Sequence, residues 1–135
     1  MAYFKYQYKD IFYEEYGQGE PIIFLHGNTA SSKMYEFLMP LYTENFRCIL
    51  IDFLGNGQSD RVESFSPDMW YDEALQTIAL TEHLQCGKVS LIGTSGGALL
   101  MKIFPLIFYL KGKRRKKMHS QGNFTNCVKV QTGKR

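Results

Sequence analysis

The chain has 135 residues and is 44% hydrophobic, which fits one globular domain. Its three cysteines, Cys48, Cys86 and Cys127, are far apart and follow no metal-binding spacing, which argues against a disulfide framework and a zinc site. No stretch is apolar over the length of a membrane span, and the first ten residues lack the apolar core of a signal peptide. We therefore expect a cytoplasmic protein.

Charge is segregated along the chain. Residues 1–110 contain 7 Lys and Arg against 13 Asp and Glu, a net charge of −6. Residues 111–135 contain 9 Lys and Arg and no acid, a net charge of +9. The small overall charge of +3 therefore hides an acidic body and a strongly basic tail.

The chain begins with a segment typical of β-structure. Residues 3–16 are rich in tyrosine and phenylalanine, and we predict two antiparallel strands joined by a tight turn at Lys9-Asp10. Gly17-Gln18-Gly19 ends the second strand. Pro21 then opens the continuous apolar run 22–25, which is typical of a strand buried in a parallel sheet.

A helix and another strand are predicted next. The helix should cover residues 33–43, with its N-cap at Ser31 or Ser32 and a kink or an early end at Pro40. Its apolar residues at helical spacing are Met34, Phe37, Leu38 and Leu41. The run 46–52 predicts a second buried strand, which a glycine-bearing loop follows.

A second helix and a third buried strand complete the pattern. Ser66-Pro67-Asp68 is a typical helix start, and the helix should run to about residue 85, with Gly87 as its end. Trp70 falls on the apolar face of this helix, so we expect it in the core rather than against a substrate. After the strand predicted at 89–92, the alternation of elements indicates an α/β fold with a mostly parallel sheet behind an N-terminal hairpin.

The stretch after the last strand reads Gly93-Thr94-Ser95-Gly96-Gly97, a G-x-S-x-G pattern. Glycines two residues before and two residues after Ser95 fit a strand-to-helix turn that is too tight for Cβ atoms. Such a turn strains the backbone of its central residue and exposes the side chain. Ser95 is therefore the candidate nucleophile.

Three motifs, each placed after a predicted strand, resemble the N-terminal half of the α/β-hydrolase superfamily. They are His26-Gly27-Asn28, the loop that begins at Asp52 and contains Gly55 and Gly57, and the turn around Ser95. The resemblance covers residues 3–101 and is greatest to the branch of esterases, proline iminopeptidase-like peptidases and haloperoxidase-like enzymes. It implies a partial α/β-hydrolase fold that hydrolyses a small-molecule ester or amide without a cofactor or metal.

The resemblance also assigns roles to residues around the turn. The backbone N–H groups of Asn28 and Gly96 would form the oxyanion hole, where two fixed donors stabilise the charge that develops on the carbonyl oxygen. The remaining motif residues, His26, Gly27, Gly93 and Gly97, would be structural at the site. Asp52 and its loop would shape the mouth of the site rather than take part in the chemistry.

The partners that a serine nucleophile needs are missing from the rest of the chain. In this family the acid and the histidine follow the serine, but the 40 residues after Ser95 contain no Asp or Glu. Their one histidine, His119, lies in a basic, polar run that does not resemble a hydrolase histidine loop. We therefore predict a truncated or frameshifted hydrolase that lacks activity.

The sequence changes character near residue 102. Pro105 falls where a helix should continue, and a polar run without periodicity follows the basic residues 111–117. We predict that residues 1–101 are the N-terminal part of the hydrolase domain. Residues 102–135 would then be a disordered, non-family tail that comes from a frameshift or a gene-model error. The sheet edge that this leaves open predicts poor solubility.

Two other interpretations compete with a hydrolase. The first is a non-catalytic protein whose basic tail binds an anionic membrane or nucleic acid, although we expect neither partner. The second is a non-catalytic relative that uses the hydrolase scaffold for contacts with other proteins.

Overall fold

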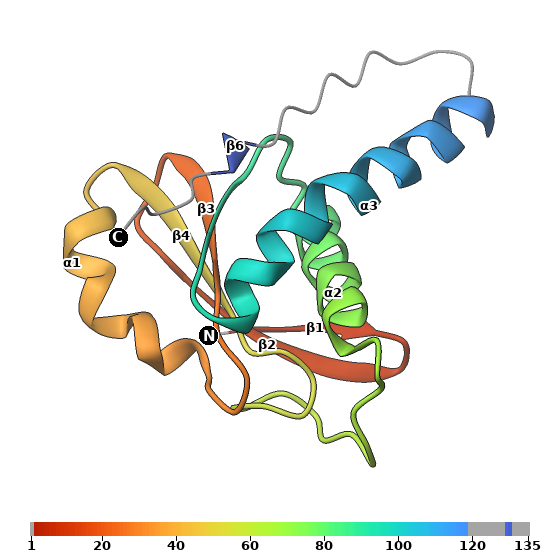
Figure 1. The fold of residues 1–135 in the computed structure, drawn as a ribbon. Helices are drawn as coiled ribbons and strands as arrows, with labels where there is room; N and C mark the ends of the chain where they lie inside the picture. The colour runs from red at the N-terminus through yellow and green to blue at the C-terminus, as the bar shows by residue number, and fades with distance from the viewer. Residues whose placement is uncertain (1, 119–128, 131–135) are drawn as a thin grey trace.

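Six strands pair into one sheet, in the order β1-β2-β4-β3-β5-β6, within residues 2–118 and 129–130, which the computed structural model describes (Figure 1). The first two strands are antiparallel to each other and β2 is antiparallel to β4, whereas the other neighbours are parallel. The strands are β1 (Ala2–Tyr6), β2 (Lys9–Tyr16), β3 (Glu20–Leu25), β4 (Phe46–Ile51), β5 (Ser90–Gly93) and β6 (Lys129–Val130). This confirms the predicted α/β fold, with an N-terminal hairpin and a mostly parallel sheet.

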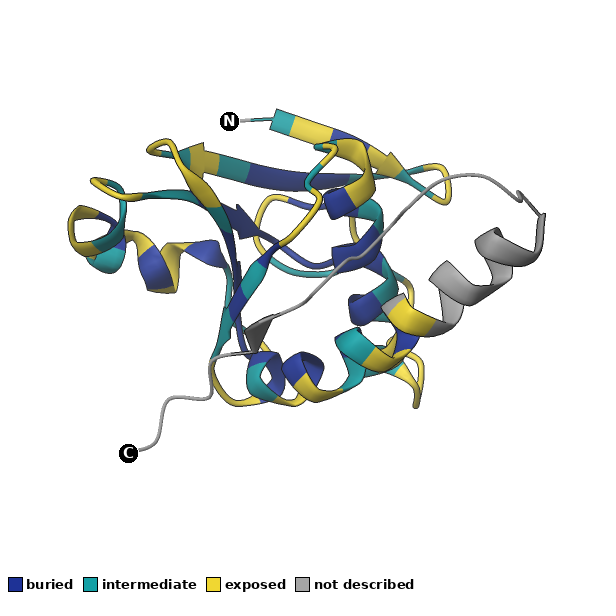
Figure 2. Ribbon diagram, turned by 90° about the horizontal axis from the view of Figure 1, so that it is seen from above, coloured by how far each residue is buried: buried dark blue, intermediate teal, exposed yellow. Residues whose placement is uncertain are grey.

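Helices cover both faces of the sheet because successive residues of a strand point to opposite sides. On one face, alternate residues of β3, β4 and β5 pack against α2 (Met69–His83) and α3 (Gly96–Met118). On the other face, the remaining residues of β3 and β4 pack against η1 (Ser32–Leu38) and α1 (Met39–Tyr42). Figure 2 shows the buried residues concentrated on the central strands between these layers. Each fully buried Ile, Leu or Phe contributes about 1.5–3 kcal/mol.

The turn of the hairpin lies two residues earlier than predicted. Gln7 and Tyr8, not Lys9-Asp10, form it, and both have left-handed backbone conformations, with φ of 47° and 69°. Lys9 and Asp10 belong to β2, where the backbone N–H of Asp10 donates to the carboxylate of Asp60. That long-range contact fixes the register, and the sequence around the turn does not reveal it.

The predicted helix at 33–43 is divided in two, and a different side of it is buried. A 3₁₀ helix covers η1, and Pro40 lies in the first turn of α1, where its missing N–H costs nothing. Tyr35 and Met39 face the sheet, whereas Phe37 and Leu41 are exposed, contrary to the prediction. A 3₁₀ segment has three residues per turn, so α-helical spacing assigned its faces wrongly.

The second predicted helix is confirmed with shifted ends. Asp68 is the N-cap of α2, and the hydroxyl of Ser66, two residues earlier, accepts a hydrogen bond from the Asp68 N–H. At the other end, Gln85 takes the left-handed conformation and the Cys86 N–H donates to the Thr81 carbonyl. This is the Schellman arrangement, so Gln85, rather than Gly87, ends the helix.

Candidate active site

Three loops emerge together at the carboxyl ends of the parallel strands. Leu25 of β3 is in register with Ile51 of β4 on one side and with Gly93 of β5 on the other. The segments that start at His26, Asp52 and Thr94 therefore leave the sheet at one edge. This is the edge at which open α/β sheets bind their ligands, and all three motifs of the sequence lie on it.

The turn between β5 and α3 has the strained geometry that the glycine pattern predicts. Ser95 has φ of +53°, in the left-handed region, and its side chain is exposed. A Cβ on Gly93 would lie 2.5 Å from the Gly97 carbonyl carbon, and a Cβ on Gly97 would lie 2.0 Å from the Leu25 oxygen. Only glycine fits at these two positions, and their close packing holds Ser95 in its unfavourable conformation.

The loop after β3 lies directly against this turn. A Cβ on Gly27 would be 3.3 Å from the Ser95 Cβ and 3.8 Å from its Oγ. The buried His26 ring fixes the loop, because Nδ1 donates to the Gly27 carbonyl at 2.8 Å and Nε2 accepts from the Phe53 N–H at 3.0 Å. Both bonds suit the neutral ring, and burial lowers the pKa of His26. Its nitrogens are thus both engaged away from Ser95.

Asn28 and Gly96 flank Ser95 with unpaired backbone donors. Among the hydrogen bonds of residues 2–118, none is donated by the N–H of either residue. Gly96 begins α3, so the positive end of the helix dipole also lies here. The Asn28 side chain is close as well, because its Oδ1 is 2.7 Å from the position of a Gly96 Cβ.

Asp52 organises the loop after β4. Its buried carboxylate accepts hydrogen bonds from the Ser32 N–H at 2.6 Å and the Gln58 N–H at 2.9 Å. Gly57 has φ of +51°, and any Cβ there would collide with the same carboxylate. These contacts occupy both oxygens of Asp52, as expected of a residue that shapes the loop.

Tyr35 is a positioning residue that the sequence did not indicate. Its buried hydroxyl donates to the Leu25 carbonyl at 2.8 Å and lies 3.3 Å from Thr94 Oγ1. It therefore ties η1 to β3 and to the residue before Ser95. The only signal in the sequence was its place in an apolar segment, and that segment was assigned to the wrong face.

Two polar groups at the start of α2 are buried. The Trp70 Nε1 is fully buried without an acceptor. The Glu73 carboxylate lines a cavity of about 110 Å³ between α2 and residues 62–66. Burial raises the pKa of Glu73 to about 7, with a smaller contribution from Asp72.

Within residues 2–118 no hydrogen bond joins a histidine or a carboxylate to the Ser95 hydroxyl. His83, near the end of α2, stacks on Phe4 with ring centroids 5.5 Å apart. His119 lies outside the described residues, as does Cys127. The same part of the chain contains no group of three side chains suited to hold a metal ion.

The tail prediction is only partly covered by the structure. The α3 helix continues through Pro105 to Met118, and β6 pairs with β5. No helix among the described residues is both long and apolar enough to cross a membrane. The side chains of 111–118 are not described, so binding of the basic segment to an anionic membrane or nucleic acid stays a prediction.

Comparisons with known proteins place this geometry in context. Residues 20–131 match the family described as "alpha/beta hydrolase fold". The chain is 40% identical over 95 residues to the AB hydrolase superfamily protein YisY of Bacillus subtilis, covering 68% of this chain and 34% of that protein. It is 36% identical over 90 residues to the proline iminopeptidase of Lactobacillus crispatus, covering 62% and 30%.

Solved structures of α/β-hydrolases share this fold. The α/β-hydrolase enzyme MGS-M2 from a deep-sea metagenome library superposes with a TM-score of 0.69 at 27% identity, over 76% of this chain and 38% of that one. The chain thus spans about a third of the length of its curated relatives, and its fold is a part of theirs. The match continues to residue 131, so the boundary at residue 101 stays a prediction.

Proposed function

Because the chain belongs to the α/β-hydrolase family, we propose that Ser95 is the nucleophile of a serine hydrolase site for esters or amides of small molecules. The observation that carries this proposal is the strained, exposed Ser95 held between two obligatory glycines. A structural serine would not need a left-handed backbone, whose cost is about 1–3 kcal/mol. The relatives that carry esterase and peptidase names support the same reaction class.

The chemistry follows from the groups around Ser95. Its Oγ would attack the substrate carbonyl carbon and give its proton to a base, which is not among the described residues. The carbonyl oxygen would carry the negative charge of the tetrahedral intermediate. That intermediate would then expel the alcohol or amine, which takes up the proton, and leave an acyl-enzyme. The unpaired N–H groups of Asn28 and Gly96 would donate to that oxygen, with support from the α3 dipole. Each such donor accounts for about a hundredfold in rate.

We further propose that the 135-residue chain alone does not turn over substrate. No described group can take the Ser95 proton, and no acid follows Ser95 in the sequence. Loss of the base from a serine hydrolase lowers kcat by about a millionfold. The site would therefore bind and position an ester, but attack it only slowly.

Labelling with an alkyl fluorophosphonate tests the nucleophile. Ser95 should displace fluoride and acquire the phosphonyl group before any other serine, as located by peptide mass spectrometry. Ser95→Ala should lose this adduct, whereas Ser90→Ala, on β5 before the turn, should keep it. Adducts spread over several surface serines would contradict the assignment of Ser95. Repeated, Ser95-dependent hydrolysis of p-nitrophenyl acetate would contradict the predicted loss of turnover.

A further inference from the structure

Trp70, the single tryptophan of the chain, has a buried indole N–H with no acceptor in the part of the chain that the structure describes. The residue lies in the first turn of α2 and packs at the edge of the core that α2 shares with α3. An unpaired buried donor costs about 1–3 kcal/mol, and native proteins satisfy nearly all of them. The unpaired state of this N–H therefore needs a reason.

The indole nitrogen lies beside the residue that follows Ser95. Trp70 Nε1 lies 3.2 Å from the position that a Cβ on Gly96 would occupy, and Asn28 Oδ1 lies 2.7 Å from the same position. Gly96 follows the nucleophile and carries one of the two proposed oxyanion donors. Because Gly96 has no side chain, the Trp70 indole N–H can lie close to the Gly96 backbone N–H as a third donor.

The acceptor of Asn28 beside Gly96 does not satisfy this donor. Asn28 Oδ1 is close, yet it forms no hydrogen bond with the indole. Asn28 is exposed, so its amide can turn aside without repacking the core. A ligand held by the backbone of Asn28 and Gly96 would then bring an acceptor of its own to the indole.

We propose that the Trp70 indole N–H is a specificity-determining donor of the Ser95 site and binds a second acceptor oxygen in the acyl group of the substrate. The first oxygen is the carbonyl oxygen held by Asn28 and Gly96, so this inference rests on the proposed function. The favoured substrate class is an ester or amide whose acyl chain carries an ether, hydroxyl or keto oxygen next to the carbonyl. Plain alkanoyl chains leave the indole unpaired, which weakens their binding.

A matched pair of esters tests this without requiring turnover. Methyl methoxyacetate and methyl butyrate differ only in an ether oxygen that replaces one methylene group. A ¹H–¹⁵N spectrum of the chain contains one tryptophan indole signal, because Trp70 is the single tryptophan. Methyl methoxyacetate should move this signal downfield with the same Kd as it moves the Asn28 and Gly96 amide signals. It should bind roughly 3- to 10-fold more tightly than methyl butyrate, the value of one hydrogen bond.

Two variants complete the test. Trp70→Phe keeps an aromatic ring but no N–H, and should make the two esters bind equally. Gly96→Ala places a methyl group 3.2 Å from the Trp70 Nε1 and 2.7 Å from the Asn28 Oδ1. It should abolish the shift of the indole signal with both esters. The wild-type titration needs neither variant to fold.

The outcomes separate this inference from the proposed function. If the amide signals of Asn28 and Gly96 move but the indole signal does not, the role of Trp70 is overturned and the oxyanion donors stand. If Trp70→Phe retains the preference for methyl methoxyacetate, the role of Trp70 is likewise overturned. If neither ester moves the amide signals, the Ser95 site does not bind esters, and both proposals fall together.

Discussion

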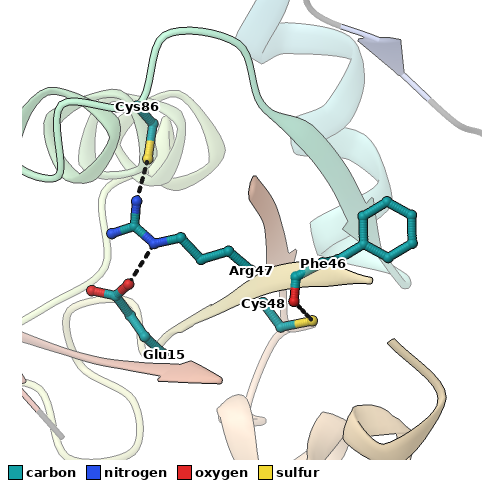
Figure 3. Close-up of polar contacts among 5 residues, drawn as sticks. All are labelled: Glu15, Phe46, Arg47, Cys48 and Cys86. Atoms are coloured by element: carbon teal, nitrogen blue, oxygen red, sulfur yellow. Dashed lines mark hydrogen bonds and ion pairs between the residues drawn. The ribbon is translucent and has the colours of Figure 1, made fainter. Parts of the chain in front are cut away.

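The two ends of the parallel strands differ in how their polar groups are paired. At the amino ends, Arg47 of β4 donates from Nε to Glu15 of β2 at 2.6 Å, and its Nη1 lies 3.8 Å from the Cys86 sulfur (Figure 3). At the carboxyl ends, the Asn28 and Gly96 N–H groups and the Trp70 indole have no acceptors among the described residues.

Backbone strain occurs at both ends, but it falls on different kinds of residue. Gln85 takes the left-handed conformation before β5, where it ends α2. Ser95 holds a left-handed backbone at the carboxyl edge, where glycine contacts leave no room for change. Unpaired donors and strained residues cost stability, so they persist where another requirement holds them in place. The unpaired donors beside Ser95 support the proposal that the carboxyl edge meets a ligand.

The largest effect should come from filling the glycine contacts of the carboxyl edge. Gly97→Ala would place a Cβ 2.0 Å from the Leu25 oxygen and 2.8 Å from its carbon, both backbone atoms that cannot move independently. We expect a loss of at least about 3 kcal/mol in the free energy of unfolding, measured by urea denaturation, or failure to fold.

Gly87→Ala is the matched control for that variant. A Cβ there meets no atom within 4 Å, and the residue lies outside the helices and strands. Its free energy of unfolding should stay within about 0.5 kcal/mol of the wild type. Equal stabilities of the two variants would refute the claim that close packing holds the turn at Ser95.

A smaller, pH-dependent effect is expected from Glu73 at the start of α2. Its pKa is about 7 in the fold and near 4.5 when unfolded, so the folded state binds the extra proton between these values. The contribution of Glu73 to the free energy of unfolding is therefore fully present below pH 4.5, and it is lost as the pH rises to about 7. The whole loss is at most about 3 kcal/mol.

Glu73→Gln should remove this loss, because the amide stays neutral at every pH. The variant should be more stable than the wild type at pH 8 and should lose that advantage near pH 4, as followed by thermal or urea unfolding. His26, whose pKa is lowered, gives the opposite slope in both proteins and cancels from their difference. Glu63→Gln, at an exposed position, serves as the control. A stability difference that does not vary with pH would refute the effect assigned to Glu73.

Local sequence predicts the carboxyl edge better than it predicts what surrounds it. The turn at Ser95 was recognisable because its glycines must stand at fixed spacing, and the apolar runs before His26, Asp52 and Thr94 marked three buried strands. Because these three strands pair in parallel, their carboxyl ends must lie at the same edge of the sheet.

Contacts between distant residues could not be predicted in the same way. Tyr35 reaches Thr94 across 59 residues, and Trp70 approaches Gly96 from another helix. Trp70 was predicted to be a core residue and Tyr35 fell outside the predicted apolar face. Periodicity reports which side of a helix is apolar but not what a polar atom on it will meet. The hairpin turn at Gln7 and Tyr8 was missed because neither residue is a usual choice for a left-handed backbone.

The smallest effect should come from the amino edge. Glu15→Gln removes the charge that pairs with Arg47, but both side chains are about one-third exposed, so water and salt replace most of the attraction. We expect a loss below about 1 kcal/mol in the free energy of unfolding that shrinks further in 1 M NaCl, as measured by urea denaturation. Asp10→Asn removes the charge that pairs with Lys5 in a more exposed ion pair, and is the reference for an ion pair at the surface. If Glu15→Gln cost as much as Gly97→Ala, the amino edge would constrain the fold as tightly as the carboxyl edge. The contrast between the two edges would then no longer identify a site.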